Sequence, residues 1–119
     1  MLKKVLLIDD DPTLLKVVQP FLTSHDFSVS VATDGEDGLK AVQKETPDLI
    51  VLDVQMPKMN GYTFIFEIKK ITNAKAIPII VLTGKDGMAE IFKVEGVKEY
   101  ISKPFKPEVL LAAIKKHIE

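Results

Sequence analysis

Five short apolar runs alternate with amphipathic stretches from one end of this chain to the other, and this alternation constrains the fold more than any other feature. Such runs are typical of buried strands, and apolar residues at helical spacing between them are typical of helices packed on a sheet. Neighbouring parallel strands cannot be joined by a tight turn and need a crossover connection, which the helices between the strands can provide. We therefore predict an α/β fold with one doubly wound parallel sheet, helices on both faces and strand order 2-1-3-4-5. The expected strands are Val5–Ile8, Val29–Ala32, Leu49–Leu52, Ile77–Leu82 and Tyr100–Ser102.

Capping residues and prolines mark the expected helices. An aspartate before the first turn can accept backbone N–H groups, and proline loses no hydrogen bond at the first helical position. Pro20 lies within the first helix, where it must remove one backbone hydrogen bond, so we expect a kink or an early end there. The helices are expected to begin at Asp11-Pro12 and Asp34-Gly35, to span Tyr62–Ile71 and Lys85–Val94, and to begin again at Pro107.

Composition narrows the class of protein. A chain of 119 residues suits one compact domain, and we expect residues 1–119 to form it, with no output domain. The 16 basic and 17 acidic residues nearly balance, so we expect no direct nucleic-acid binding, and no apolar run is long enough for membrane insertion. Without cysteine there is no disulfide or thiolate metal site, and without a signal-peptide pattern we expect a cytoplasmic protein.

Polar side chains follow four of the expected strands at the point where each strand ends. Asp9 and Asp10 follow the first strand, Asp53 the third, Thr83 the fourth and Lys103 the fifth. Ligands of open parallel sheets bind beyond the carboxyl ends of the strands, at the switch point between strands one and three. We therefore expect these five side chains to meet at one pole of the molecule.

Three carboxylates at one pole need positive charge nearby. Two carboxylates about 4 Å apart repel by roughly 4 kcal/mol at an effective dielectric constant of about 20, so a cation is expected among them. Oxygen ligands favour Mg²⁺ over zinc, which prefers nitrogen and sulfur. With such a cation, the Asp53 carboxylate can attack phosphorus while the Lys103 ammonium and the Thr83 hydroxyl contact the phosphoryl oxygens.

The chain also resembles the response regulator receiver domains of the CheY-like superfamily, over its full length. That family has a flavodoxin-like (βα)5 fold and acts in two-component signal transduction. Four motifs in order carry the resemblance: Leu7-Ile8-Asp9-Asp10-Asp11, Asp53-x-x-Met56-Pro57-x-Met59-x-Gly61, Thr83-Gly84 and Lys103-Pro104-Phe105.

The resemblance implies a role for each residue of the site. Asp53 is the phosphorylated residue, and Asp9, Asp10 and Asp53 hold Mg²⁺ together with the backbone carbonyl of Gln55. Lys103 contacts the phosphoryl group, and the peptide bond from Lys103 to Pro104 is cis.

The resemblance also implies a switch and a set of partners. Thr83 moves toward the phosphoryl group and Tyr100 turns inward, which changes the surface formed by the expected helix at 85–94, the fifth strand and the last helix. The phosphoryl donor is a sensor histidine kinase or a histidine phosphotransfer protein, and a downstream protein target binds the changed surface. The chain is then a monomer that can dimerise on phosphorylation, and it is not a conventional turnover enzyme. Gln55 and Lys85 occupy positions that tune the lifetime of the phosphoryl group.

One segment departs from the family pattern. The stretch from Thr83 to Lys103 is slightly short and glycine-containing, and Val97 stands where the family favours alanine. A short or irregular helix at 85–94 would leave the site intact and would alter the surface that partners recognise.

Other interpretations fit part of the sequence. Asp9-x-Asp11-x-Thr13 also matches the nucleophile motif of haloacid-dehalogenase-like phosphatases, but that reading finds no later acidic pair and leaves Asp53 unexplained. A flavodoxin-like FMN carrier would place its phosphate loop where Asp9 to Asp11 would repel an anion. A receiver that has lost phosphorylation and serves only as a binding module is disfavoured by the complete set of five site residues. Taken alone, the Asp9 to Asp11 triplet reads equally well as a helix cap.

Overall fold

The computed structural model describes residues 2–54, 61–71, 77–84 and 97–118. Helices and strands alternate in this part of the chain as far as residue 83, as the apolar runs predict. The elements are β1 (Lys3–Ile8), α1 (Pro12–Ser24), β2 (Phe27–Ala32), α2 (Gly35–Lys44), β3 (Leu49–Asp53), α3 (Gly61–Ile68), β4 (Ile79–Thr83), β5 (Val97–Ser102) and α4 (Pro107–Ile118). The expected helix at 85–94 lies outside the described residues.

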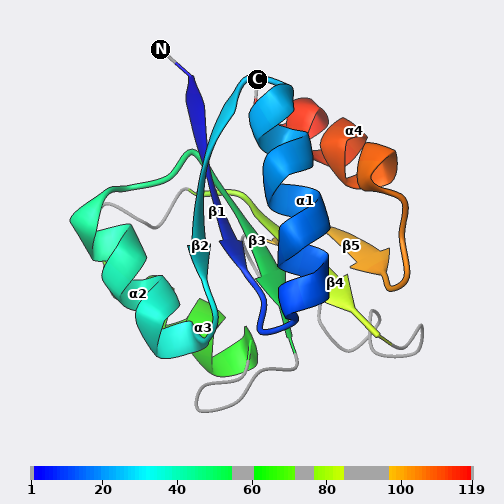
Figure 1. Ribbon diagram of the computed structural model, residues 1–119. Coiled ribbons are helices and arrows are strands. Elements are labelled where there is room, and N and C mark those ends of the chain that lie inside the picture. The colour runs from blue at the N-terminus through cyan, green and yellow to red at the C-terminus, as the bar shows by residue number, and fades with distance from the viewer. Residues whose placement is uncertain (1, 55–60, 72–76, 85–96, 119) are drawn as a thin grey trace.

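The five strands form one parallel sheet in the order β2-β1-β3-β4-β5 (Figure 1). The predicted fold class and strand order are therefore confirmed. The order changes direction between β1 and β3, which lie side by side at the centre of the sheet. All five arrowheads point toward the same end of the molecule (Figure 1), so the carboxyl ends of the strands share one pole.

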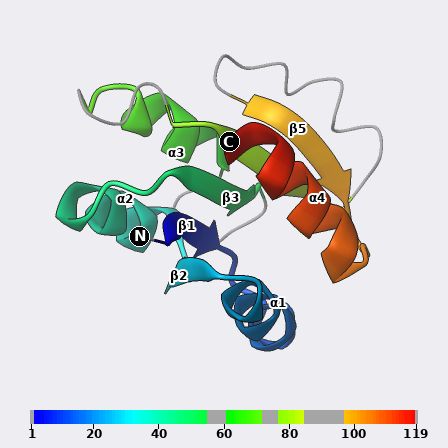
Figure 2. The ribbon, with the colours of Figure 1, turned by 90° about the horizontal axis from the view of Figure 1, so that it is seen from above.

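Helices cover both faces of the sheet, with α1 and α4 on one side and α2 and α3 on the other (Figure 2). Each face has its own core because neighbouring residues of a strand point to opposite faces. In β1, Leu6 and Ile8 join the core beneath α2 and α3, whereas Val5 and Leu7 join the core beneath α1 and α4. The central strand β3 is buried at every position, as expected for a strand with helices on both faces.

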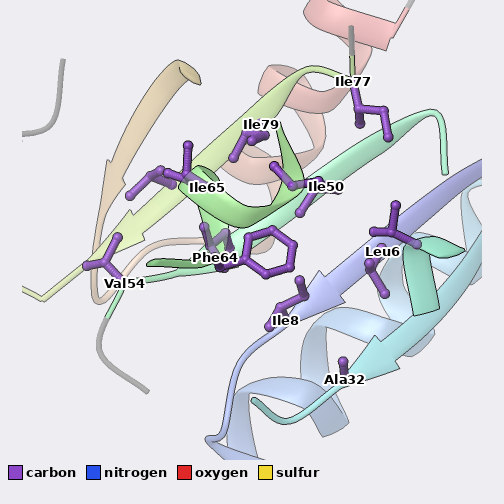
Figure 3. Close-up of a cluster of buried hydrophobic side chains, with 13 residues drawn as sticks. Leu6, Ile8, Ala32, Ile50, Val54, Phe64, Ile65, Ile77 and Ile79 are labelled. Atoms are coloured by element: carbon purple, nitrogen blue, oxygen red, sulfur yellow. The ribbon is translucent and has the colours of Figure 1, made fainter. Parts of the chain in front are cut away.

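The core beneath α2 and α3 is closely packed around Phe64 of α3, which is fully buried (Figure 3). Gly38 of α2 lies against this core, and a Cβ atom at this position would be 2.7 Å from Cδ1 of Ile8 and 3.0 Å from Cε1 of Phe64. Such distances leave no room for a methyl group without movement of the neighbours. The glycine therefore allows α2 to approach β1 and α3 closely.

The helices begin where the capping residues predicted. The Asp11 side chain accepts the N–H of Thr13 at 3.0 Å and Pro12 is the first residue of α1, while the Asp34 side chain accepts the N–H of Asp37 at the start of α2. The prediction that Pro20 could end the first helix early was wrong. Helix α1 continues through Pro20 to Ser24, and Pro20 lies on its exposed side. None of the helices in the described ranges is both long and apolar enough to span a membrane.

Candidate functional site

The residues expected at the strand ends come from four neighbouring strands of the sheet. Asp9 and Asp10 directly follow β1, Asp53 is the last residue of β3, and Thr83 is the last residue of β4. Lys103 directly follows β5. Because these strands are parallel, the five residues lie at the same pole of the sheet (Figure 1).

Three carboxylates converge at this pole. Asp9, Asp10 and Asp53 each offer an oxygen atom, and these oxygens all lie within 4.8 Å of one another. The side chains of Asp9 and Asp53 are buried, with 0% and 6% exposure, whereas Asp10 is exposed. The cluster therefore has two carboxylates inside the molecule and one that faces solvent.

Lys103 supplies a positive charge to this cluster. Its ammonium donates to Oδ2 of Asp9 at 2.9 Å and forms an ion pair with Oδ2 of Asp53 at 3.5 Å. Burial lowers the pKa of Lys103, but the hydrogen bonds and charges of Asp9 and Asp53 outweigh burial and raise the pKa above its ordinary value. Lys103 is therefore held in its charged form.

The first turn of α1 fixes the orientation of Asp9. Oδ1 of Asp9 accepts the N–H of Asp11 at 2.9 Å, and the Asp11 side chain in turn caps the helix. Asp11 thus serves the start of α1, and the three-carboxylate cluster is formed by its neighbours Asp9 and Asp10 with Asp53. The sequence allowed the acidic triplet to be a helix cap or part of a metal site. Asp11 is the helix cap, and Asp9 and Asp10 belong to the carboxylate cluster.

Thr83 lies beside Asp53 in the sheet. Asp53 is paired with Leu82 in the register of β3 and β4, so Thr83 is the next residue along the neighbouring strand. Thr83 is buried, and its carbonyl accepts the N–H of Lys103 at 2.7 Å. This hydrogen bond fixes the backbone of Lys103, from which its side chain extends, relative to β4.

Tyr100 lies on β5, paired with Val81 of β4, and its ring packs against the core beneath α2 and α3. Its hydroxyl is buried and has no hydrogen-bond partner among the described residues. The peptide bond from Lys103 to Pro104 is cis. Gln55 and Lys85, which the resemblance singled out, lie outside the described residues.

Sequence reasoning did not predict a hollow of about 480 Å³ beside the cluster. It lies between α1 and the segment after β5, and Leu14, Val17, Lys103 and Phe105 are among the residues that line it. Val17 is 52% exposed although it is apolar. The sequence contained little sign of this surface, because a single exposed apolar residue such as Val17 is common on folded proteins.

Comparison with known proteins identifies the family that this geometry fits. The family model of the response regulator receiver domain matches residues 5–115. Protein PilG of Pseudomonas aeruginosa is 36% identical over 117 residues, which cover 97% of this chain and 87% of PilG. The chain also matches several transcriptional regulators, of whose length it spans about half.

Solved structures agree with this match. Chemotaxis protein CheY4 of Vibrio cholerae superposes with a TM-score of 0.91 at 31% identity, covering 98% of this chain and 99% of CheY4. The receiver domain of sensor histidine kinase PA1611 from Pseudomonas aeruginosa superposes with a TM-score of 0.90 at 28% identity, covering 99% of this chain and 98% of that domain. The PA1611 receiver domain was solved with a magnesium ion coordinated in its active site cleft.

Proposed function

This chain belongs to the family of response regulator receiver domains of two-component signalling, and from that premise we propose that it accepts a phosphoryl group on Asp53. Receiver domains interact with histidine kinases or phosphotransfer proteins and with downstream targets. The proposed donor is the phosphohistidine of a sensor histidine kinase or of a histidine phosphotransfer protein. The observation that carries the proposal is the meeting of Asp53 with Lys103, Asp9 and Asp10 at the pole of the sheet.

Asp53 is the nucleophile in this proposal. Its carboxylate oxygen forms a bond to phosphorus while the bond between phosphorus and the imidazole nitrogen of the donor breaks. The imidazole leaves with the electron pair of that bond, and Asp53 becomes an acyl phosphate. Because Asp53 is buried, its carboxylate is held in a fixed position at the end of β3 rather than moving in solvent.

Lys103 and Thr83 serve the phosphoryl oxygens. The Lys103 ammonium is 3.5 Å from Oδ2 of Asp53, so a phosphoryl group on Asp53 would lie within reach of its charge. Thr83 ends the strand beside Asp53, where its hydroxyl can donate to a phosphoryl oxygen after a small movement. We propose that this movement and an inward position of Tyr100 shift the population of conformers at β5 and α4, where a downstream protein binds.

The carboxylate cluster fits a hard divalent cation. Asp9, Asp10 and Asp53 offer only oxygen ligands, all within 4.8 Å of one another, and one of them faces solvent. We propose that these three residues, with the backbone carbonyl of Gln55, hold Mg²⁺. When bound, Mg²⁺ supplies positive charge that neutralises phosphoryl oxygens during transfer. The magnesium ion in the PA1611 receiver domain supports this choice of metal.

Phosphorylation of purified protein by a small phosphodonor tests the proposal. We expect incubation with Mg²⁺ and phosphoramidate to add one phosphoryl group by intact-protein mass spectrometry, and peptide mapping to find it on Asp53. The variant Asp53→Asn should show no labelling, since an amide is a poor nucleophile. Chelation of Mg²⁺ should abolish labelling of the wild type.

Asp11→Asn is the matched control because it removes one carboxylate from the same pole and leaves a residue that can still cap α1. We expect this variant to be labelled as the wild type is. Labelling that persists in Asp53→Asn would contradict the role of Asp53. Labelling that maps to Asp9 would favour the phosphatase interpretation, in which Asp9 is the nucleophile.

A further inference from the structure

Strand β2 is the last strand on one side of the sheet, and its outer edge is unpaired within the described residues. The strand order places β2 beside β1 alone. Figure 2 shows β2 at the margin of the sheet, with α1 and α2 on opposite faces. The backbone N–H and C=O groups of such an edge are a template for pairing with a further strand.

Alternate residues of β2 present their backbone groups to this edge. The carbonyl of Ala32 accepts the N–H of Asp9, so the backbone groups of Ala32 point toward β1. The N–H and C=O of one residue point to the same side of a strand, and successive residues point to opposite sides. The outward groups therefore belong to Phe27, Val29 and Val31.

The sequence of β2 lacks the features that usually protect an edge strand. Charged side chains, proline and irregular pairing keep edges from associating, and Phe27–Ala32 contains no charged residue and no proline. Strand β5, at the opposite margin of the sheet, does have such features. It carries Lys98 and Glu99, and its register with β4 shifts between Ile79 and Ile80. Of the two margins, β2 is therefore the one suited to pairing.

The pattern of β2 is complementary to itself in the antiparallel direction. A two-fold axis at Val29 places this residue opposite its own copy. The same axis places Phe27 opposite Val31, and Ser28 opposite Ser30. The three outward residues would each exchange two hydrogen bonds with the residue opposite. Their apolar side chains would meet on the face beneath α1, where Val29 and Val31 are only half-buried, and the exposed serines would meet on the other face.

We propose that two copies of this chain associate through the outer edges of β2, antiparallel and with the two-fold axis at Val29. The product is a continuous sheet of ten strands, five from each copy. No like charges meet in this register, because Asp26, which precedes β2, lies opposite Ala32 of the other copy. The association goes beyond the proposed function, since it needs neither Mg²⁺ nor a phosphoryl group and leaves the surface of β5 and α4 uncovered.

Sedimentation equilibrium in the presence of a chelator and without a phosphodonor tests the association. The contact is small, so we expect the wild type to dimerise with a dissociation constant on the order of 100 μM. A wild type that stays monomeric at about 1 mM would overturn the proposal. Labelling at Asp53 does not depend on this contact, so that result would leave the proposed function intact.

Substitution of the two exposed serines tests whether β2 forms the contact. Ser28→Lys combined with Ser30→Lys places like charges opposite each other twice, and should raise the dissociation constant about tenfold. Ser28→Glu combined with Ser30→Glu should do the same. An equimolar mixture of the two double variants brings opposite charges together and should dimerise at least as tightly as the wild type. Failure of this mixture to associate, with both variants folded by circular dichroism, would contradict the antiparallel contact.

Val109→Lys combined with Ala112→Lys is the matched control. It adds the same charge at two exposed positions of α4, which packs on β3 and β5 and is remote from the β2 edge. This variant should dimerise as the wild type does. An equal loss of association in the control would show that net charge or another surface, rather than β2, governs the dimer.

Introduced cysteines test the register, because the chain has no cysteine of its own. Ser28→Cys and Ser30→Cys are mixed in a glutathione redox buffer. Opposite residues of this kind lie about 4.5 Å apart at Cα, within the range of a disulfide. We expect the mixed disulfide between the two variants to far exceed the amount that random collision gives. A predominance of the two symmetric disulfides would contradict the axis at Val29.

Hydrogen exchange of the wild type avoids substitution altogether. The amides of Val29 and Val31 point outward, so their exchange should slow as the protein concentration rises and the dimer forms. The amides of Ser28 and Ser30 point toward β1 and should be protected at every concentration. Exchange at Val29 and Val31 that does not change across the range in which sedimentation detects the dimer would place the contact elsewhere and overturn the proposal.

Discussion

Lys103 links the charge of the site to the stability of the fold. Its pKa is raised in the folded state because its hydrogen bonds and ion pairs with Asp9 and Asp53 outweigh burial. A raised folded-state pKa stabilises the fold fully below the unfolded-state value of about 10.4, and this contribution is lost as the pH rises through the folded-state value. We therefore expect the wild type to lose stability more steeply above about pH 10.4 than a variant without this group.

Urea denaturation between neutral and strongly alkaline pH, in the presence of a chelator, measures this loss. Lys103→Met should show a shallower decline of the unfolding free energy in the alkaline range than the wild type. Lys4→Met removes a lysine from a more exposed ion pair and should follow the wild-type curve. Parallel curves for the wild type and Lys103→Met would show that Lys103 does not contribute in this way.

The environment of the Tyr100 hydroxyl also leads to a prediction about stability. It is buried and lacks a hydrogen-bond partner within the part of the chain that the structure describes, although the ring packs against the core. Removal of a buried hydroxyl without a partner loses no hydrogen bond and relieves a desolvation cost of about 1–3 kcal/mol at most. We expect Tyr100→Phe to be as stable as the wild type or more stable, by up to about 1 kcal/mol, in urea denaturation.

A destabilisation of Tyr100→Phe by more than about 1 kcal/mol would contradict this prediction and would indicate a hydrogen-bond partner for the hydroxyl.

Helix α2 depends on Gly38 for its distance from the sheet. A Cβ at this position would meet Ile8 at 2.7 Å and the ring of Phe64 at 3.0 Å, and both neighbours are fully buried. Overpacking of a filled core costs about 1–3 kcal/mol, whereas the higher helix propensity of alanine returns up to about 1 kcal/mol. We expect Gly38→Ala to lower the free energy of unfolding by about 1–2 kcal/mol in urea denaturation.

Lys40→Ala provides the comparison within α2, since Lys40 is exposed and its replacement leaves the core unchanged. We expect it to lie within about 0.5 kcal/mol of the wild type. A Gly38→Ala variant as stable as Lys40→Ala would mean that α2 can move away from β1 at little cost.

The elements were predictable at their centres and less so at their ends. The apolar run of β3 was predicted almost to the residue because burial on both faces requires apolar side chains throughout. Strand β5 begins at Val97 rather than at Tyr100, because its backbone hydrogen bonds with β4 extend over polar residues that carry no apolar signal. Helix α1 passes through Pro20 because its core contacts at Val18 and Leu22 continue on both sides of the proline.

The whole sheet explains why the site could be predicted and its contacts could not. Residues at the ends of parallel strands must share a pole, so the convergence of Asp9, Asp53 and Lys103 follows from the strand order alone. The pairing of Lys103 with Asp9 at 2.9 Å in preference to Asp53 at 3.5 Å depends on side-chain conformations that no spacing in the sequence encodes. Topology thus predicts which residues meet, and packing decides which atoms touch.

Binding of a cation at the pole of the sheet should stabilise both cores against unfolding. The strands that carry the site also form the two cores, so unfolding of either core would break the cation site and lose the free energy of cation binding. Mg²⁺ at about 100 times its dissociation constant should add about 2.7 kcal/mol to the free energy of unfolding. In urea denaturation with Mg²⁺, circular dichroism and tyrosine fluorescence should report the same shifted midpoint of unfolding. The midpoint of Asp10→Asn, which loses one proposed ligand at an exposed position, should shift much less on addition of Mg²⁺. A shift seen by one probe and not by the other would mean that the pole and the rest of the sheet unfold separately.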